Sequence, residues 1–307
     1  MVYVIILNWN GADDTIKCLK SLGCLDGLLP KVIVCDNNST DDSLSKIEDF
    51  LTHQTRLEIQ LVQTGLNLGF AAGNNVGLHI ALSDSAMDFV WLLNNDTLVA
   101  PGALIALKRY MYLHTTVGVC GPTLLYADEP NRIQAVGGRY NPWLGVSEHV
   151  LGNQLFSPTL CQTVNRAELD YVVGASMFIR REVIEKLGFL SENYFLYYEE
   201  IDFAMRLKRE MPHLTIGYAH DSLVFHKEGA STKSSNRLVK TYCYFSDFFF
   251  ITSRLKFSRK FYPLHSLVVQ ASMLLVALRR IRSGQFRSAL VALCCFCGVI
   301  PNWLDPR

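Results

Sequence analysis

Four short, mostly apolar runs recur in the first hundred residues, and each is followed by a polar turn and a segment long enough for a helix. They are Tyr3–Leu7, Lys31–Cys35, Leu57–Gln63 and Asp88–Asn94. Apolar runs of this length, bounded by polar turn formers, are typical of strands that are buried on both faces. Strands that alternate with helices indicate βαβ units with right-handed crossovers. The sequence therefore predicts an α/β fold with a mainly parallel sheet.

The same pattern extends along the chain with less regularity. Helices are expected from Asp13 or Asp14 to Leu22, after Asp42 to Leu51, over Ala71–Ser83, from Pro101 to Leu113, over Glu182–Leu187 and over Glu199–Arg209. Further strands are expected at Val117–Leu125, Tyr171–Ile179, Leu214–Tyr218 and Leu223–Phe225. The segment Ala127–Gly152 is rich in Gly, Pro and Asn, which predicts a hairpin or loop over the site.

Polar side chains follow the predicted strands at the point where each strand ends. Asn8-Trp9-Asn10 follows the first strand, Asp36-Asn37-Asn38 the second, and Asn94-Asn95-Asp96 the fourth. Open α/β sheets bind ligands at the carboxyl ends of their strands. A carboxylate flanked by amides can hold a hard divalent cation through oxygen ligands. Ordinary Asn/Asp turns are the alternative interpretation of these segments.

Charge and cysteine content exclude several classes of protein. The net charge of +1 over 307 residues gives no reason to expect a nucleic-acid partner. The nine cysteines are odd in number and show no regular spacing, which favours a reducing compartment. Cys294, Cys295 and Cys297 lie inside an apolar run and suit core or membrane-facing positions better than a zinc site. Met1–Leu7 lacks the basic start of a signal peptide.

The C-terminal segment differs from the rest because basic residues outnumber acidic ones there. Two apolar segments, Leu264–Leu278 and Ala289–Ile300, flank a basic cluster of Arg279, Arg280, Arg282 and Arg287. This pattern favours a helical hairpin in a membrane interface, and a helical pair packed on the core is the alternative. No apolar run reaches the roughly 18 uninterrupted residues needed to span a bilayer.

Five blocks in a fixed order resemble the family 2 glycosyltransferases, of the bacterial rhamnosyltransferase-like branch. They are Val4–Leu22, Val32–Ser43, Gly65–Leu78, Val90–Leu104 and Gly174–Arg209, and His226 followed by Gly229–Ser231 closes the set. The resemblance implies a GT-A fold with one Rossmann-like sheet flanked by helices. It assigns residues 1–230 to the catalytic domain, with a nucleotide-sugar half (1–97) and an acceptor half (98–230). Residues 231–307 would form a helical, membrane-associating extension.

The resemblance also implies how a nucleotide-diphosphate sugar is held. Asp36 would read the edge of the base, the backbone around Asn8 and Asn10 would cradle it, and Asn38 would lie alongside. Asn67 and Asn74 come from the loop and helix that this family places near the nucleotide, where Asn74 could equally be a helix cap. Gly65, Gly69 and Gly73 permit tight turns and close backbone approach in this segment.

The metal site is implied by Asn94-Asn95-Asp96, which takes the place of the family's Asp-x-Asp motif. Asp96 is then the one carboxylate ligand, and His226 matches the family's further ligand. Mg²⁺ or Mn²⁺ is the expected cofactor, completed by the donor's phosphates and water. Such a cation would stabilise the charge that develops on the leaving diphosphate.

The acceptor side is implied by the Glu199-Glu200 pair, which stands where the family has Glu-Asp. Glu200 is the expected base, with Glu199 as the alternative, and it would deprotonate the acceptor hydroxyl in a single displacement that inverts the anomeric carbon. Gly174 and Ala175 are small residues inside a predicted strand, which often mark the close approach of a ligand. They are therefore assigned to the acceptor side.

The resulting hypothesis is an inverting glycosyltransferase on the cytoplasmic face of the cell membrane. Its donor would be dTDP-rhamnose or a UDP-hexose, and its acceptor a lipid-linked saccharide in cell-surface polysaccharide synthesis. A non-catalytic nucleotide-sugar-binding protein with the same fold is the second hypothesis. A nucleotidyltransferase is the third, although no Gly-rich segment with a following Lys occurs near the N-terminus.

Overall fold

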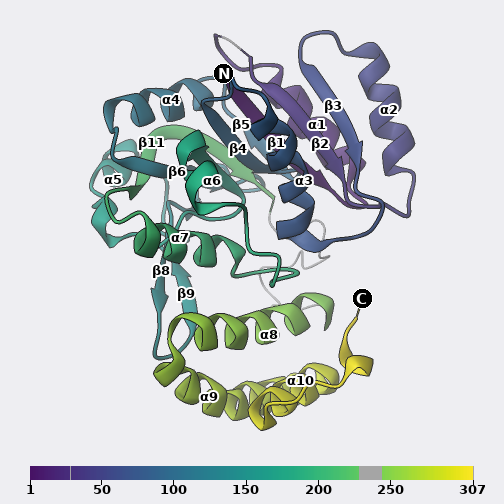
Figure 1. The fold of residues 1–307 in the computed structure, drawn as a ribbon, viewed down its shortest axis with the longest axis vertical. Coiled ribbons are helices and arrows are strands. Elements are labelled where there is room, and N and C mark those ends of the chain that lie inside the picture. Colours follow the sequence, from purple (N-terminus) through teal and green to yellow (C-terminus); the bar gives the residue numbers. More distant parts are fainter. Residues whose placement is uncertain (28, 228–243, 307) are drawn as a thin grey trace.

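The computed structural model describes residues 1–27, 29–227 and 244–306, and its first half follows the predicted alternation. The elements are β1 (Val2–Asn8), α1 (Ala12–Leu22), β2 (Lys31–Asp36), α2 (Ser43–His53), β3 (Glu58–Gln63), α3 (Gly69–Ser83) and β4 (Phe89–Asn94). The four strands are parallel in the order β3-β2-β1-β4, so their carboxyl ends meet along one edge (Figure 1).

The second half makes the sheet mixed. The strands of this half that join the main sheet, and the helices between them, are β5 (Thr97–Val99), α4 (Ala103–Leu113), β6 (Val117–Tyr126), β7 (Ile133–Ala135), β10 (Ser176–Arg180), α6 (Arg181–Leu187), α7 (Glu199–Glu210) and β11 (Thr215–His226). Strand β10 lies antiparallel between β4 and β6, and β5 lies antiparallel beside β11. The α/β class and the single sheet are confirmed, but the sheet is mainly parallel only in its first half, where the alternation of strands and helices is regular.

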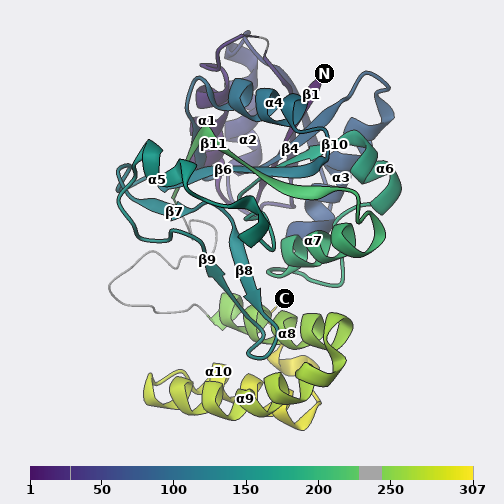
Figure 2. The ribbon, with the colours of Figure 1, turned by 90° about the vertical axis from the view of Figure 1, so that its left-hand side faces the viewer.

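Two predicted strands of the second half are merged in the structure, and the hairpin expected within Ala127–Gly152 is present. The two short strands expected at Leu214–Tyr218 and Leu223–Phe225 form one strand, β11, whose pairing with β6 shifts between Ala219 and Leu223. The Gly-rich segment contains a separate two-stranded hairpin, β8 (Gly138–Asn141) and β9 (Val146–His149). Figure 2 shows this hairpin extending away from the sheet toward the C-terminal helices. Short helices follow at α5 (Pro158–Gln162) and Arg166–Glu168.

The core lies on both faces of the sheet because its central strands are buried on both sides. Along β1, Val4 and Ile6 pack on the face covered by α1 and α4, while Tyr3 and Ile5 pack on the face covered by α3 and α6. Helix α3 approaches β1 closely, since a Cβ added at Gly73 would lie 2.5 Å from the Leu7 side chain. This three-layer arrangement holds the carboxyl edge of the parallel strands in place.

Within residues 244–306 the structure contains three α-helices, followed by a short turn at Asn302–Leu304. They are α8 (Tyr244–Phe261), α9 (Pro263–Arg282) and α10 (Phe286–Cys297). The predicted domain boundary at residues 230 and 231 and the Gly229–Ser231 segment fall outside the described residues. Helix α8 packs on the sheet-containing part of the chain: Ser253 Oγ donates to the Leu196 carbonyl, and the Phe257 ring packs against Tyr140 and Tyr198.

The C-terminal helices differ in how they pack, and the membrane-interface interpretation of α9 and α10 stays a prediction. Helix α8 lies against the domain, whereas α9 and α10 pack on α8 and leave large apolar side chains exposed on their outer side. Helix α9 is long and apolar enough, by length and composition alone, to cross a membrane. The sequence expectation concerned uninterrupted apolar runs, and His265, Ser266 and Gln270 do interrupt the apolar run of α9, so α9 meets the criterion only by its hydropathy averaged over the helix.

Asp202 joins α7 to α8 and should be essential for stability. Its fully buried carboxylate accepts hydrogen bonds from Arg206, Lys260 and Tyr194. Removing one member of a buried ion pair leaves the remaining charge uncompensated and costs about 3 kcal/mol or more. We therefore expect Asp202→Asn to lower the free energy of unfolding by about 3 kcal/mol in urea denaturation.

Asp221→Asn is the matched control, because Asp221 pairs with Arg109 and both side chains are exposed. Exposed pairs contribute at most about 1 kcal/mol. Equal losses of stability in the two variants would contradict the role given to Asp202.

Candidate active site

A cavity of about 470 Å³ opens at the carboxyl edge of the parallel strands. This volume lies in the range of roughly 300–1,000 Å³ that is typical of small-molecule sites. One end is lined by residues after β1, β2 and β3, and the centre by those after β4 and at the end of β11. The opposite end is lined by β9, the segment before β10 and the start of α7, and helix α8 lines the cavity with Phe245 stacked on Trp9 at 5.9 Å between ring centres.

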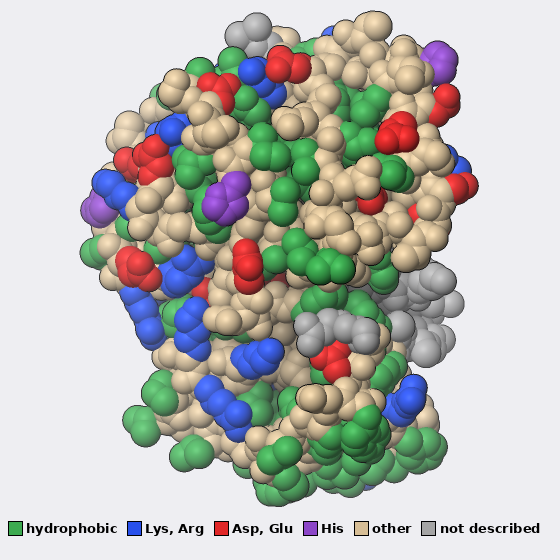
Figure 3. All heavy atoms as spheres, turned by 45° about the vertical axis from the view of Figure 1, so that its right-hand side comes forward, with side chains coloured by type: hydrophobic (Ala, Val, Ile, Leu, Met, Phe, Trp, Pro, Cys, Tyr) green, Lys and Arg blue, Asp and Glu red, His purple; other side chains and the backbone are tan. Residues whose placement is uncertain are grey.

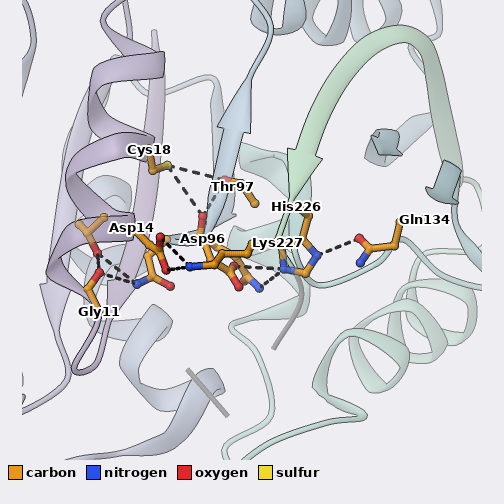
Figure 4. Close-up of polar contacts among 11 residues, drawn as sticks. Gly11, Asp14, Cys18, Asp96, Thr97, Gln134, His226 and Lys227 are labelled. Atoms are coloured by element: carbon orange, nitrogen blue, oxygen red, sulfur yellow. Dashed lines mark hydrogen bonds and ion pairs between the residues drawn. The ribbon is translucent and has the colours of Figure 1, made fainter. Parts of the chain in front are cut away.

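Asp96 and His226 meet at the centre of the cavity. The His226 Nε2 lies 3.1 Å from Asp96 Oδ1, although 130 residues separate the two in sequence. The antiparallel pairing of β5 with β11 brings them together, because it sets His226 opposite Thr97. Figure 4 shows Asp14, Lys227, Asp96 and His226 lying in a row from α1 to the end of β11, with Gln134 on the far side of His226.

Gln134 orients the His226 ring. The His226 Nδ1 lies 2.8 Å from Gln134 Oε1, an acceptor, so Nδ1 carries the proton and donates. In the neutral ring this leaves the lone pair on Nε2, which faces the Asp96 carboxylate. An imidazole held in this way by a hydrogen-bond partner behind it is typical of histidines that bind metals.

Lys227 closes the same region from the other side. Its ammonium donates to the Asp14 carboxylate at 3.0 Å, and its backbone amide donates to the Asp96 carbonyl. These two contacts fasten the end of β11 to the start of α1 and to the segment after β4. The aspartate and the histidine are thereby held by elements from both halves of the sheet.

Glu199 and Glu200 form the first turn of α7 and line the end of the cavity opposite the residues after β1, β2 and β3. Both carboxylates are largely withdrawn from water, and the Oε2 atom of each has no hydrogen-bond partner within the described residues. Burial raises the pKa of Glu200 to about 7. Burial, together with the neighbouring Glu200 charge, raises the pKa of Glu199 well above its usual value. Two carboxyl groups in one site thus hold protons near neutral pH.

The backbone before these glutamates is strained. Tyr197 and Tyr198 have φ values of 67° and 74°, a left-handed conformation that costs a bulky residue about 1–3 kcal/mol. The Tyr198 hydroxyl donates to the Gly145 carbonyl at the hairpin tip, and both rings pack against Phe250 of α8. This packing holds the sharp turn that directs the start of α7 at the cavity.

Two of the asparagines that line the cavity after β2 and β3 hold the loops in place. Asn37 is buried, donates to Asn67 Oδ1 and to the Gly69 carbonyl, and accepts from the Leu68 amide. Two features require glycine at position 69. Its φ is 81°, and an added Cβ would lie 2.3 Å from the Phe195 carbonyl. The loop after β3 is therefore packed directly against the segment that leads into α7.

A second network surrounds Asp36. Its carboxylate accepts from Asn8 Nδ2 at 2.8 Å and from the backbone and hydroxyl of Ser39. Asn10 and Asn38 both adopt positive φ, and Asn10 Oδ1 accepts from the Thr40 amide. Asp36 is thus a buried, fixed acceptor at the strand end.

The predicted site residues divide into two sets. Nine of them line the cavity: Asn67, Asn94, Asn95, Asp96, Gly174, Ala175, Glu199, Glu200 and His226. Five lie outside its lining, namely Asn8, Asn10, Asp36, Asn38 and Asn74. Asn74 donates to the Phe70 carbonyl within α3, so its observed contact is internal to the helix.

Sequence reasoning missed three contributions to the cavity. Asn37 lines it although Asp36 and Asn38 were singled out, and its place inside the same polar turn could have revealed it. Gln134 carries no signal in the sequence because its partner His226 is 92 residues away. Phe245, Ser246 and Phe250 line the cavity from α8, so a C-terminal helix forms one of its walls.

The charge of the lining restricts what it can bind. The described lining residues include three carboxylates and two histidines but no Lys or Arg. A diphosphate in this cavity would therefore need a cation to offset its charge. The donor set of a carboxylate and an oriented imidazole fits Mg²⁺ or Mn²⁺. No group of three or more His, Cys, Asp or Glu could hold a metal among the residues that the structure describes, so two protein ligands would leave positions for phosphates and water.

Comparison with known families gives a match over most of the sheet. A family model described as "Glycosyl transferase family 2" matches residues 3–188. The chain is 25% identical over 209 residues to the low-salt glycan biosynthesis hexosyltransferase Agl10 of Haloferax volcanii, covering 67% of this chain and 61% of that protein. It is 26% identical over 224 residues to the N-acetylglucosaminyl-diphospho-decaprenol L-rhamnosyltransferase of Mycobacterium tuberculosis, covering 66% and 69%.

Solved structures share the fold. The mannosyltransferase PcManGT of Pyrobaculum calidifontis, in complex with GDP-Man and Mn²⁺, superposes with a TM-score of 0.56 at 16% identity, covering 99% of this chain and 76% of that one. S. aureus TarS 1–349 in complex with UDP-GlcNAc gives a TM-score of 0.51 at 14% identity, covering 97% and 92%. At these identities the likeness establishes the GT-A fold.

The buried glutamates should make stability depend on pH. The folded protein holds protons on these groups more tightly than the unfolded chain does, so their contribution to stability falls as pH rises from about 4.5 through about 7. We expect Glu199→Gln to raise the melting temperature at pH 8 more than at pH 5. Scanning calorimetry at the two pH values measures this difference.

Glu210→Gln is the matched control, since Glu210 is exposed at the other end of the same helix. An increase in the melting temperature that is the same at both pH values would contradict the assignment of Glu199 as a buried, protonated group.

Proposed function

The chain belongs to glycosyl transferase family 2, and from this we propose that it transfers a sugar from a nucleotide-diphosphate donor to a hydroxyl of a saccharide acceptor. One observation carries the proposal: the Asp96–His226 pair and the Glu199–Glu200 pair line the same cavity. A leaving diphosphate and an attacking hydroxyl need these two kinds of group on opposite sides of the anomeric carbon.

Glu200 is the proposed base. A base with a pKa near the working pH combines a useful ionised fraction with a useful proton affinity, and burial gives Glu200 a pKa of about 7. Its carboxylate would take the proton of the acceptor hydroxyl as that oxygen attacks the anomeric carbon. One displacement of this kind inverts the configuration of the transferred sugar.

Glu199 is the more deeply buried member of the pair, and burial together with the Glu200 charge raises its pKa well above its usual value. We assign it the role of a protonated neighbour that keeps the surroundings of Glu200 apolar. The adjacent Gly174 leaves room beside the Glu200 side chain, because a Cβ there would lie 3.7 Å from Glu200 Cβ. Gly174 and Ala175 are accordingly proposed to contact the acceptor.

Asp96 and His226 are proposed to hold Mg²⁺ or Mn²⁺ together with the donor's phosphates. The absence of Lys and Arg from the described lining residues supports this assignment. When bound, the cation would stabilise the charge on the departing diphosphate. Asn94 and Asn95 line the same part of the cavity and would contact the phosphates or the sugar.

The nucleotide is proposed to occupy the end lined by Trp9, Asn37 and Asn67. Asp36 would recognise the base with a carboxylate that Asn8 and Ser39 already hold in one orientation. Asn10 and Asn38 would shape the loop around it. Asn74 supports this end only through the structure of α3.

The donor and acceptor are proposed from the relatives. Hexosyltransferase and rhamnosyltransferase relatives favour dTDP-rhamnose or a UDP-hexose as donor, and a relative that acts on a decaprenol diphosphate favours a lipid-linked saccharide as acceptor. The apolar outer side of α9 and α10 favours a site on the cytoplasmic face of a membrane. Residues 244–306 carry eight Lys or Arg against two Asp, which suits an anionic lipid surface.

Loss of the Glu200 carboxylate should abolish transfer. We expect Glu200→Gln to lower kcat by about 100-fold or more, because general base catalysis typically contributes at least that factor. Glu199→Gln should retain kcat within about tenfold. The wild-type kcat/KM should rise with pH and level off above about 7, as the base loses its proton. A larger loss in Glu199→Gln than in Glu200→Gln would assign the base to Glu199 instead.

Gln134 should affect metal binding through His226. Removing a partner that orients a metal-bound histidine typically weakens the metal by about 10–100-fold. We expect this loss of Mn²⁺ affinity in Gln134→Leu, measured by electron paramagnetic resonance with nucleotide diphosphate present. Gln134→Glu should retain affinity, because its carboxylate also accepts the Nδ1 proton. Gln154→Leu, at an exposed glutamine, is the control, and an equal effect there would contradict the role of Gln134.

The most decisive test of the reaction itself is a panel of nucleotide sugars, read by release of the nucleotide diphosphate with and without Mn²⁺. The wild type should turn over at least one donor, and Asp96→Ala should not. Equal turnover of that donor by both proteins would overturn the proposed site.

A further inference from the structure

The tip of the β8–β9 hairpin carries exposed apolar residues where a turn usually carries polar ones. The side chains of Trp143 and Leu144 are 61% and 51% exposed. The turn itself is well formed, since Asn141 Oδ1 accepts from the amides of both residues. Turns normally favour small and polar side chains, so two large apolar ones at a tip point to contact with another surface.

The tip is also fixed in place beside α9. The Trp143 ring packs edge-on against His265 at 4.3 Å between ring centres. Gly145 lies so close to Val269 that an added Cβ would be 2.9 Å from its methyl group. From α8, the buried Arg254 guanidinium donates to the Leu144 carbonyl and to Ser272. The hairpin and the C-terminal helices therefore form one structural unit.

The outer side of α9 and α10 continues this apolar surface. Leu264, Leu267 and Leu275 are 82%, 69% and 61% exposed. Figure 3 shows hydrophobic side chains gathered over the C-terminal helices, with Lys and Arg side chains in the band next to them. We name the tip residues Trp143 and Leu144 together with the exposed leucines of α9 the apolar base.

We propose that the catalytic domain itself contacts an anionic lipid surface through Trp143 and Leu144, as one part of the apolar base. This rests on the proposed membrane association, which assigned the contact to the C-terminal helices alone. Lipid fits better than a second copy of this chain, because two copies would bring the basic clusters around Arg279, Arg282 and Arg287 together. A Trp side chain next to an apolar face that enters the membrane is also typical of residues at the level of the lipid headgroups.

The hairpin tip is connected to the catalytic cavity over a short distance. Ser147 and His149 of β9 line the cavity, and Ser147 is three residues from Leu144. At about 3.3 Å per residue in a strand, the cavity wall begins about 10 Å from the tip. The Tyr198 hydroxyl, which precedes the glutamate pair, is bonded to Gly145 at the tip. Contact at the tip would therefore place Glu200, the proposed general base, at the depth where the first sugar of a lipid-linked acceptor lies.

Vesicle binding by the full chain tests the proposal. Co-sedimentation would use phosphatidylcholine vesicles with and without phosphatidylglycerol. We expect the double variant Trp143→Ser, Leu144→Ser to bind the anionic vesicles at least about tenfold more weakly, since two large apolar side chains lose their burial. Leu155→Ser, at an equally exposed leucine outside the apolar base, should bind as the wild type does.

Tryptophan quenching by brominated lipids locates the contact directly. Trp91 is fully buried, so Trp143 and Trp303 are the strongly exposed tryptophans among the described residues. Quenching should fall sharply in Trp143→Phe and persist in Trp303→Phe. Undiminished binding by the double variant, or undiminished quenching in Trp143→Phe, would overturn the proposal. Dimers whose formation requires Trp143 and that leave vesicles unbound would also overturn it.

An assay of nucleotide diphosphate release in detergent tests the proposed tip contact separately from the proposed reaction. The tip variants should retain the donor turnover of the wild type, because Trp143 and Leu144 do not line the cavity. Loss of vesicle binding with normal turnover supports the tip contact, whereas a protein that turns over no donor but binds vesicles through Trp143 would refute only the proposed reaction.

Discussion

The three-residue pairing of β5 with β11 is the contact on which the candidate site most depends. It sets His226 opposite Thr97. The His226 imidazole, at the end of β11, therefore lies next to Asp96, which follows β4. His226 can reach this position because β10 is inserted antiparallel between β4 and β6. This insertion places the later strands β6 and β11 further along the sheet. A hydrogen bond from Trp91 of β4 to Ser176 of β10 fixes the insertion inside the core. A polar contact at the centre of the cavity thus depends on strand order far from it.

The end of the cavity lined by the start of α7 holds energetically unfavourable features, which the surrounding packing stabilises. Glu199 is buried beside Glu200, whose Oε2 atom is also withdrawn from water, and two consecutive tyrosines before them adopt left-handed backbone conformations. Asp202, one turn further along α7, compensates through bonds from Arg206 and Lys260 that anchor the helix to its neighbours. A carboxylate with a pKa near 7 needs this low-dielectric setting, and the same setting lowers stability at neutral pH. Local instability and proton affinity therefore have one physical cause.

Sequence reasoning succeeded where the determining interactions are local. The β-strands of the first half and the polar turns after them follow from patterns within a few residues, and nine of the predicted site residues line one cavity. It failed where the outcome depends on distant partners. The antiparallel direction of β10 depends on which strands flank it, and Gln134 is informative only once His226 is beside it. Asp36 and Asn74 have internal partners that their turn and helix positions did not distinguish from ligand contacts.

Helix α8 makes the C-terminal region part of the catalytic unit as well as a support for the apolar base. One side of α8 lines the cavity with Phe245, Ser246 and Phe250. Its other side carries α9 and α10, and the fully buried Asp247, next to Ser246, is paired with Arg280 of α9. A buried pair of this kind is sensitive to the loss of either partner, so it fixes the position of α9 relative to the cavity wall. The hairpin tip and α8 are joined through Arg254 and Leu144. Contact of α9 and the tip with a surface would therefore act on both β9 and α8, which line the cavity. Membrane contact and acceptor binding are therefore expected to be coupled through rigid packing, without a change of fold.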